Sequence, residues 1–158
     1  MKLLIVDDDS QICSSLARSL IRLGHAARAA TSLDSALRLV ESEAPAAVLT
    51  DLDLGPGGDG VELILRLRGQ GCRVPTVMMT GSDPVMARAR LARAGLSEVA
   101  LLEKPFAFDD LMKVLSAMIA PLAVPYAAPA AMAPRAPRLT PVATIVENVV
   151  RTLGGRVL

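Results

Sequence analysis

The sequence predicts an α/β fold in which a doubly wound parallel sheet of the (βα)5 type is covered by helices. Short apolar runs recur along the first 120 residues, and stretches with helical periodicity separate them. Continuous apolar runs are typical of strands that are buried on both faces, as in a parallel sheet between two helical layers. The predicted strands are residues 3–6, 25–30, 46–50, 76–79 and 99–102, of which 25–30 has the weakest pattern.

Helices are predicted between these strands from the spacing of apolar residues and from signals at the helix ends. In residues 11–23 and 33–43, apolar side chains recur every three or four positions, so each helix has one apolar stripe. Small polar residues and proline favour helix starts, whereas glycine favours helix ends. The start signals are Ser10, Ser32 and Asp83-Pro84, and the end signals are Gly24, Gly69 and Gly95.

The composition changes after about residue 120, which divides the chain into three parts. Residues 1–120 form the predicted domain. Residues 121–140 are rich in proline and alanine, a composition typical of a semi-extended linker. Residues 141–158 predict a C-terminal amphipathic helix with an apolar stripe on one side. This stripe consists of Val142, Ile145, Val146, Val149, Val150 and Leu153.

The charge distribution does not favour a nucleic-acid-binding protein. The formal net charge is +1: residues 1–120 carry 13 basic and 15 acidic side chains, and the remainder carries four arginines and one glutamate. This basic surplus after residue 120 is small, and it contains neither a clustered basic run nor interleaved aromatic residues. We therefore expect no nucleic-acid partner.

Neither the cysteines nor the apolar segments indicate a secreted or membrane protein. Cys13 and Cys72 lack the spacing of a metal or redox motif, and the single histidine, His25, has no partner at metal-ligand spacing. The N-terminal apolar run is too short for a signal peptide, and prolines interrupt the apolar region 117–133. We therefore expect reduced thiols and a soluble, cytoplasmic protein that does not contact a membrane.

Polar residues follow four of the predicted strands at the points where the strands end. Asp7 and Asp8 follow the first strand, and Asp51 follows the third. Thr80 ends the fourth strand region, and Lys104 follows the fifth. In a doubly wound sheet, ligands bind outside the carboxyl ends of the strands. We therefore expect these side chains to form one functional site.

The residue types at these strand ends favour phosphoryl chemistry beside a divalent cation. Carboxylates that crowd at one edge repel each other unless a cation lies between them, and Mg²⁺ prefers such oxygen ligands. The Asp51 carboxylate is able to attack a phosphorus centre and to form an aspartyl phosphate. The Lys104 ammonium would neutralise oxygens of the transferred group, and the Thr80 hydroxyl would donate a hydrogen bond to one of them.

Four segments together resemble the receiver domains of bacterial two-component response regulators. They are residues 5–10 (Ile-Val-Asp-Asp-Asp-Ser), 51–60 (Asp-Leu-Asp-Leu-Gly-Pro-Gly-Gly-Asp-Gly), 77–81 (Val-Met-Met-Thr-Gly) and 103–106 (Glu-Lys-Pro-Phe). Each segment alone is a weak signal, but the four in this order and at these intervals are specific. The resemblance covers residues 1–120 and implies a flavodoxin-like fold.

This resemblance implies a role for each matching residue. It implies a Mg²⁺ ion as the cofactor and a switch rather than an enzyme. The phosphoryl donor would be a phosphohistidine on a sensor histidine kinase or a phosphotransfer protein. The implied roles are Mg²⁺ ligands for Asp7, Asp8, Asp51 and the main-chain carbonyl of Asp53, phosphoacceptor for Asp51, switch hydroxyl for Thr80 and phosphate-binding amine for Lys104.

Two features depart from the usual pattern of that family. The loop at residues 55–58 is one residue longer than the commonest form, which need not damage the site. Leu101, three residues before Lys104, stands where the family usually has an aromatic residue whose rotamer follows the threonine. The coupling of phosphorylation to the surface is therefore expected to differ here. We interpret Asp59 as the cap of the helix that follows it, which is an ordinary structural role.

Two alternatives for the function remain open at this point. The Asp51-Leu52-Asp53 pattern is similar to that of haloacid-dehalogenase-like phosphatases, but that family needs the motif on the first strand and leaves Asp7 and Asp8 unexplained. The chain is alternatively the N-terminal part of a DNA-binding transcriptional regulator, although residues 121–158 contain no pair of helices that would read DNA.

The output of the switch is expected to be a protein–protein interaction. In the resembling family, the surface formed by the fourth helix, the fifth strand and the fifth helix often contacts partners. The C-terminal helix has an apolar stripe that must be covered, and a homodimer is one means of covering it. We expect a homodimer that forms through one of these two surfaces.

Overall fold

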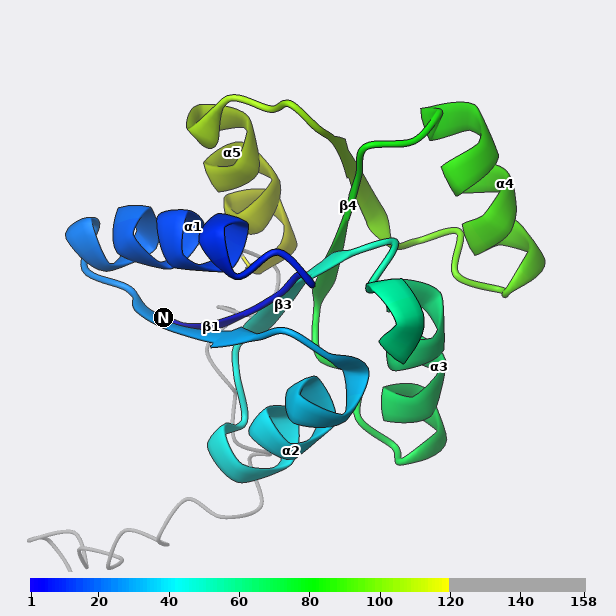
Figure 1. Cartoon of the computed structure of the whole chain (residues 1–158), viewed down its shortest axis with the longest axis horizontal. Coiled ribbons are helices and arrows are strands. Elements are labelled where there is room, and N and C mark those ends of the chain that lie inside the picture. The colour runs from blue at the N-terminus through cyan, green and yellow to red at the C-terminus, as the bar shows by residue number, and fades with distance from the viewer. Residues whose placement is uncertain (120–158) are drawn as a thin grey trace, which may run out of the picture. The chain divides into compact units, whose positions relative to one another are not determined.

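The computed structural model describes residues 1–119 as a parallel five-stranded sheet with helices on both faces (Figure 1). The strand order is β2-β1-β3-β4-β5. The strands are β1 (Lys2–Val6), β2 (Ala26–Ala30), β3 (Ala47–Asp51), β4 (Thr76–Thr80) and β5 (Ala100–Glu103). The helices are α1 (Ser10–Arg22), α2 (Leu33–Glu43), α3 (Gly60–Gly69), α4 (Pro84–Arg93) and α5 (Phe108–Ile119), with a short 3-10 helix, η1 (Gly55–Gly57), before α3. This confirms the predicted (βα)5 arrangement, and the strand order is that of flavodoxin-like folds.

The central strands β1, β3 and β4 are apolar because both of their faces are covered. On one face, Ile5 of β1 and Leu49 of β3 pack with α1 and α5. On the other face, Leu4 and Val48 pack with α2 and α3. Beside this second layer, residues of α3 and α4 form a further buried cluster around Met78 of β4. The sheet is therefore rigid at the centre, where the carboxyl ends of β1, β3 and β4 meet.

The edge strand β2 explains the weak sequence signal of residues 25–30. It pairs only with β1, and three of its five residues are exposed. A strand that is half covered needs fewer large apolar side chains than a central strand. The alanines of this segment therefore still form a strand, because β1 supplies a paired backbone.

One predicted helix cap differs from the structure. The predicted helix 33–43 is confirmed as α2 with Ser32 as its cap, but α1 is capped by Asp9 rather than by Ser10. The Asp9 carboxylate accepts hydrogen bonds from the next backbone N–H groups, which places Ser10 inside the helix. Gly69 is the last residue of α3, as predicted. The glycine with a positive φ lies two residues further on, where Gly71 has a φ of +79°.

The predicted linker 121–140 and the predicted helix 141–158 lie outside the described residues. Within residues 1–119, no helix is long and apolar enough to cross a membrane.

Candidate functional site

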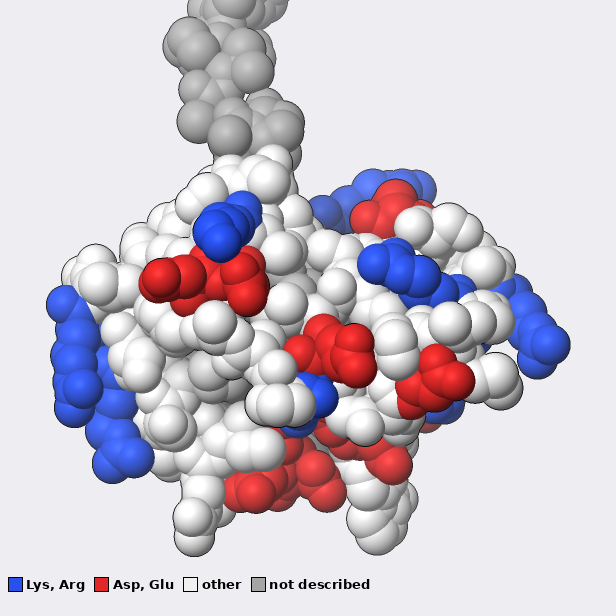
Figure 2. Space-filling view, turned by 90° about the horizontal axis from the view of Figure 1, so that it is seen from above, with Lys and Arg blue, Asp and Glu red and all other residues white. Residues whose placement is uncertain are grey.

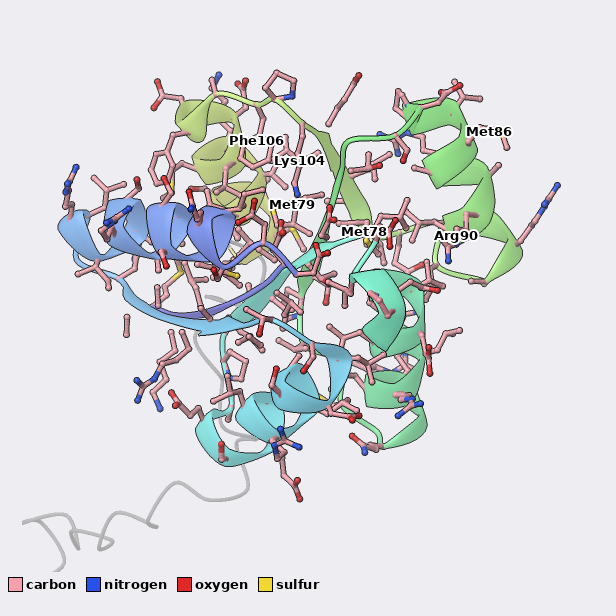
Figure 3. All side chains as sticks on the ribbon, in the orientation of Figure 1. Met78, Met79, Met86, Arg90, Lys104 and Phe106 are labelled. Atoms are coloured by element: carbon pink, nitrogen blue, oxygen red, sulfur yellow. The ribbon has the colours of Figure 1, made fainter. Side chains whose placement is uncertain are left out.

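Three charged side chains meet where β1, β3 and β5 end. Asp7 follows β1, Asp51 is the last residue of β3, and Lys104 follows β5. The Lys104 side chain points inward over the edge of the sheet (Figure 3). Its Nζ atom lies 2.7 Å from Oδ2 of Asp7 and 3.0 Å from Oδ1 of Asp51. The sheet therefore brings a lysine between two carboxylates that are 44 residues apart in the sequence.

The carboxylates of Asp7, Asp8 and Asp51 form a triad at this edge. One oxygen from each of the three lies within 4.8 Å of the others. Asp7 is almost fully buried, Asp51 is partly buried and Asp8 is exposed, so the triad opens to solvent on one side. Carboxylate oxygens so close together fit a hard divalent cation such as Mg²⁺.

The loop after β3 is shaped around this triad. Gly55 has a φ of +64°, and a Cβ atom there would lie 3.0 Å from Oδ2 of Asp8. The Asp53 side chain accepts a hydrogen bond from the Gly55 N–H group at 3.1 Å. The Asp53 carboxylate therefore accepts a hydrogen bond within the loop, and the main-chain carbonyl of Asp53 remains the group to which the family resemblance assigns metal binding.

Burial and charge act together on the ionisation of this site. Burial of the Asp51 carboxylate raises its pKa, and the charge of Asp7 adds to this, while Lys104 opposes both. Burial of the Lys104 ammonium acts to lower its pKa, but the hydrogen bonds to Asp7 and Asp51 outweigh it and the pKa is raised. Figure 2 shows acidic side chains in several separate groups over one face of the domain, with most of the basic side chains toward its sides. With all four groups ionised, the three carboxylates and the single ammonium group leave the site negative overall.

Thr80 lies at the end of β4 and is 1% exposed. Its hydroxyl accepts a hydrogen bond from the backbone N–H group of Ser82 at 3.0 Å, and its carbonyl accepts one from the Lys104 N–H group at 2.7 Å. The Lys104–Pro105 peptide bond is cis. Thr80 thus contacts both the loop before α4 and the residue that carries the site's ammonium group.

Two contributions to the site were not predicted from the sequence. Gly60, the first residue of α3, lies so close to β3 that a Cβ atom would be 2.3 Å from the Asp51 carbonyl oxygen. Cys13 lies behind Asp7, and its thiol donates to the Asp7 carbonyl at 3.5 Å. Burial raises the pKa of this thiol, so it stays protonated. The doubled glycines near residue 58 signal a tight loop, but no sequence pattern identifies which glycine contacts β3.

Comparison with known proteins identifies the family. Residues 3–116 match the family model described as the response regulator receiver domain. The chain belongs to this family. Response regulator MprA of Mycolicibacterium vanbaalenii is 34% identical over 119 residues, which cover 75% of this chain and 50% of MprA. MprA of Mycobacterium tuberculosis has the same identity and coverage. The chain thus spans about half the length of these curated relatives.

Solved receiver domains have the same fold. The receiver domain of NtrX from Brucella abortus is 31% identical, with a TM-score of 0.67 over 75% of this chain and 98% of that domain. The BeF3-activated N-terminal receiver domain of RstA from Klebsiella pneumoniae is 28% identical, with a TM-score of 0.67 over the same shares. This chain is therefore a two-component receiver with an acidic pocket of Asp7, Asp8 and Asp51. The phosphatase alternative finds no support, since the Asp51 motif lies on the third strand of a receiver fold.

Proposed function

We propose that this receiver domain accepts one phosphoryl group on Asp51 and so switches protein–protein interactions. Receiver domains in general partner with histidine kinases, and we propose a sensor histidine kinase or a phosphotransfer protein as the donor. The observation that carries this proposal is the position of Lys104 Nζ between Asp7 and Asp51, beside a carboxylate triad that opens to solvent.

The transfer would proceed by displacement at phosphorus. An oxygen of the Asp51 carboxylate attacks the phosphorus of a phosphohistidine, and a P–O bond forms as the P–N bond breaks. The imidazole of the donor leaves with the electron pair of the broken bond and takes up a proton from solvent. Burial raises the pKa of Asp51, and a more basic carboxylate is a better nucleophile in its ionised form.

The neighbouring groups would stabilise the transferred phosphoryl group. Asp7, Asp8, Asp51 and the Asp53 main-chain carbonyl would hold Mg²⁺, which when bound neutralises charge on the phosphoryl oxygens. Lys104 would exchange its bond to the Asp51 carboxylate for a bond to a phosphoryl oxygen. Thr80, at the end of β4, would donate a hydrogen bond from its hydroxyl group to another phosphoryl oxygen.

The test is the intact mass of the full chain after incubation with acetyl phosphate. We expect a gain of one phosphoryl group that requires Mg²⁺ and is lost in Asp51→Asn. Asp109→Asn, which removes a carboxylate from the first turn of α5, serves as the matched control and retains the gain. No gain in the wild type, or an undiminished gain in Asp51→Asn, would refute the assignment.

The part of the chain beyond residue 120 supplies the proposed output. We propose that residues 121–140 act as a linker and that residues 141–158 form an amphipathic helix that joins two copies of the chain, with the surface of α4, β5 and α5 as the second candidate for dimerisation. Light scattering of the full chain should give a dimer mass, and Val146→Asp in the apolar stripe should give a monomer mass. A monomeric wild type would refute dimerisation.

The predicted cytoplasmic location agrees with a histidine kinase as donor.

A further inference from the structure

Helix α4 is held to the rest of the domain by few apolar contacts. Seven of its ten residues are exposed, a larger share than in any other helix of residues 1–119, and only Ala87 and Leu91 are buried. Val85 and Met86, in its first turn, are 72% and 66% exposed, and Met86 lies on the outer side of the helix (Figure 3). An element with so little buried apolar surface belongs to the low-stability part of a domain. Polar contacts therefore carry more weight in fixing the position of α4 than they do for the other helices.

One ion pair joins α4 to the beginning of α3. Arg90 lies on the side of α4 that faces α3 (Figure 3), and its Nη2 atom is 2.6 Å from Oδ2 of Asp59. The other oxygen of Asp59, Oδ1, accepts a hydrogen bond from the Glu62 N–H group at 2.9 Å and so caps α3. The side chains of Asp59 and Arg90 are 28% and 49% exposed. We call this pair the clasp.

The Asp59 end of the clasp is attached directly to the phosphoacceptor strand. Asp59 forms an antiparallel bridge with Asp53, the residue whose carbonyl is the proposed metal ligand. The next residue, Gly60, donates its N–H group to the Leu52 carbonyl at 3.0 Å and lies against the Asp51 carbonyl without room for a Cβ atom. Asp59 therefore cannot shift without moving the backbone around Asp51.

The other end of α4 is attached to the site through Thr80. The Thr80 hydroxyl accepts the N–H group of Ser82, which lies two residues before the start of α4. If the Thr80 side chain turns toward a phosphoryl group on Asp51, this hydrogen bond is strained and the loop before α4 must rearrange. A rearrangement of α4 relative to α3 would in turn stretch the clasp.

We propose that Asp59 and Arg90 are positioning residues whose ion pair holds α4 in its unphosphorylated arrangement and so opposes phosphorylation of Asp51. This inference rests on the proposed function of Asp51. The ion pair would restrain α4 in a chain where Leu101, which pairs with Met78 on β4, stands in place of the aromatic residue usual in the family. An interaction that is made in only one of two states stabilises that state. Loss of the ion pair would therefore shift the equilibrium toward the other arrangement of α4, the one that phosphorylation of Asp51 favours.

The test is the rate at which acetyl phosphate modifies the full chain with saturating Mg²⁺, measured by intact mass. Asp59→Asn removes the charge but keeps a good helix cap, and Arg90→Met removes the partner. Each should raise the rate about 1.5- to 5-fold, the range that an exposed ion pair supplies. The double variant should be no faster than either single variant, because both remove the same interaction.

Two further variants separate the clasp from a general effect of charge. Arg90→Lys keeps the positive charge and should restore a rate near that of the wild type. Arg93→Met removes an arginine from the same helix that has no ion pair within residues 1–119, and its rate should equal the wild-type rate. Single variants with wild-type rates, or effects that add in the double variant, would overturn the proposal.

Hydrogen exchange of the unphosphorylated protein provides a second measurement. Backbone amides of α4 should exchange faster in Asp59→Asn and Arg90→Met, whereas those of α5 should not change. Unchanged exchange in α4 would refute the clasp even if Asp51 is phosphorylated. A wild type that accepts no phosphoryl group would instead refute the proposed function, so the two failures are distinguishable.

Discussion

Replacing Gly60 by alanine should be among the most destabilising single-methyl changes in this domain. The added Cβ atom would lie 2.3 Å from the Asp51 carbonyl oxygen and 2.8 Å from the Met78 sulfur, whereas carbon and oxygen atoms normally approach to about 3.3 Å. The start of α3 must therefore move by about 1 Å. Such overpacking costs about 1–3 kcal/mol. The hydrogen bond from Gly60 to Leu52, which contributes about 1 kcal/mol, is weakened too.

Gly69 provides a matched control in the same helix. A Cβ atom at Gly69 would meet no atom within 4 Å, so Gly69→Ala gains helix propensity without a clash and should stabilise the protein by about 0.5–1 kcal/mol. After the same gain is allowed for, Gly60→Ala should lower the free energy of unfolding by about 1–3 kcal/mol.

The assay for this pair is urea unfolding followed by far-UV circular dichroism, since residues 1–119 contain neither tryptophan nor tyrosine. At the slopes usual for small domains, the midpoint should fall by about 1–2 M urea for Gly60→Ala and rise slightly for Gly69→Ala. If Gly60→Ala were as stable as Gly69→Ala, the close approach of α3 to the Asp51 carbonyl would be wrong, and the link from Asp59 to the site would lose its basis.

Three further predictions concern charged residues of the site and the two thiols of the domain. Asp8→Asn should weaken Mg²⁺ binding at least about tenfold, measured by titration, and should raise stability in metal-free buffer because it relieves like-charge repulsion. Iodoacetamide at pH 8 should alkylate the partly exposed Cys72 before the buried Cys13, whose pKa is raised by burial, as mass spectrometry of digested protein would show. The pKa of Lys104 is raised in the folded protein, so its contribution to stability is complete below its pKa in the unfolded chain and is lost as pH rises through its pKa in the folded protein. The urea midpoint of unfolding should therefore fall more steeply at alkaline pH in the wild type than in Lys104→Met.

The sequence predicts the layers of this fold because its helices and strands have different apolar periods. Even the poor pattern of β2 was placed correctly, since the spacing of the better strands leaves room for one more. Helix ends were less certain. Asp9 and Ser10 are both good caps, and only the backbone geometry decides that Asp9 caps α1. The helix end at Gly69 was predicted, whereas the positive φ of Gly71 was not, because a positive φ is not visible in a sequence.

The charged residues of the site were predictable, whereas their supports were not. Asp7, Asp51 and Lys104 follow strands, and strand ends meet at one edge whatever the details of packing. The close contact of Gly60 with β3 and the ion pair of the clasp depend on how closely α3 and α4 approach the sheet and each other. Arg90 is one of three arginines between residues 88 and 93, and no local pattern distinguishes it from Arg88 or Arg93.

The charge balance of the pocket connects its resting structure with its chemistry. Asp7, Asp8 and Asp51 bring three negative charges when ionised, and Lys104 cancels one of them. Two negative charges remain beside an opening to solvent, which matches the charge of a divalent cation. Under the proposed function, addition of a phosphoryl group to Asp51 would change this balance and provide Lys104 with a new partner. The bonds that Lys104 and Thr80 make in the resting site would then be exchanged, and Thr80 would be the residue through which this exchange reaches α4.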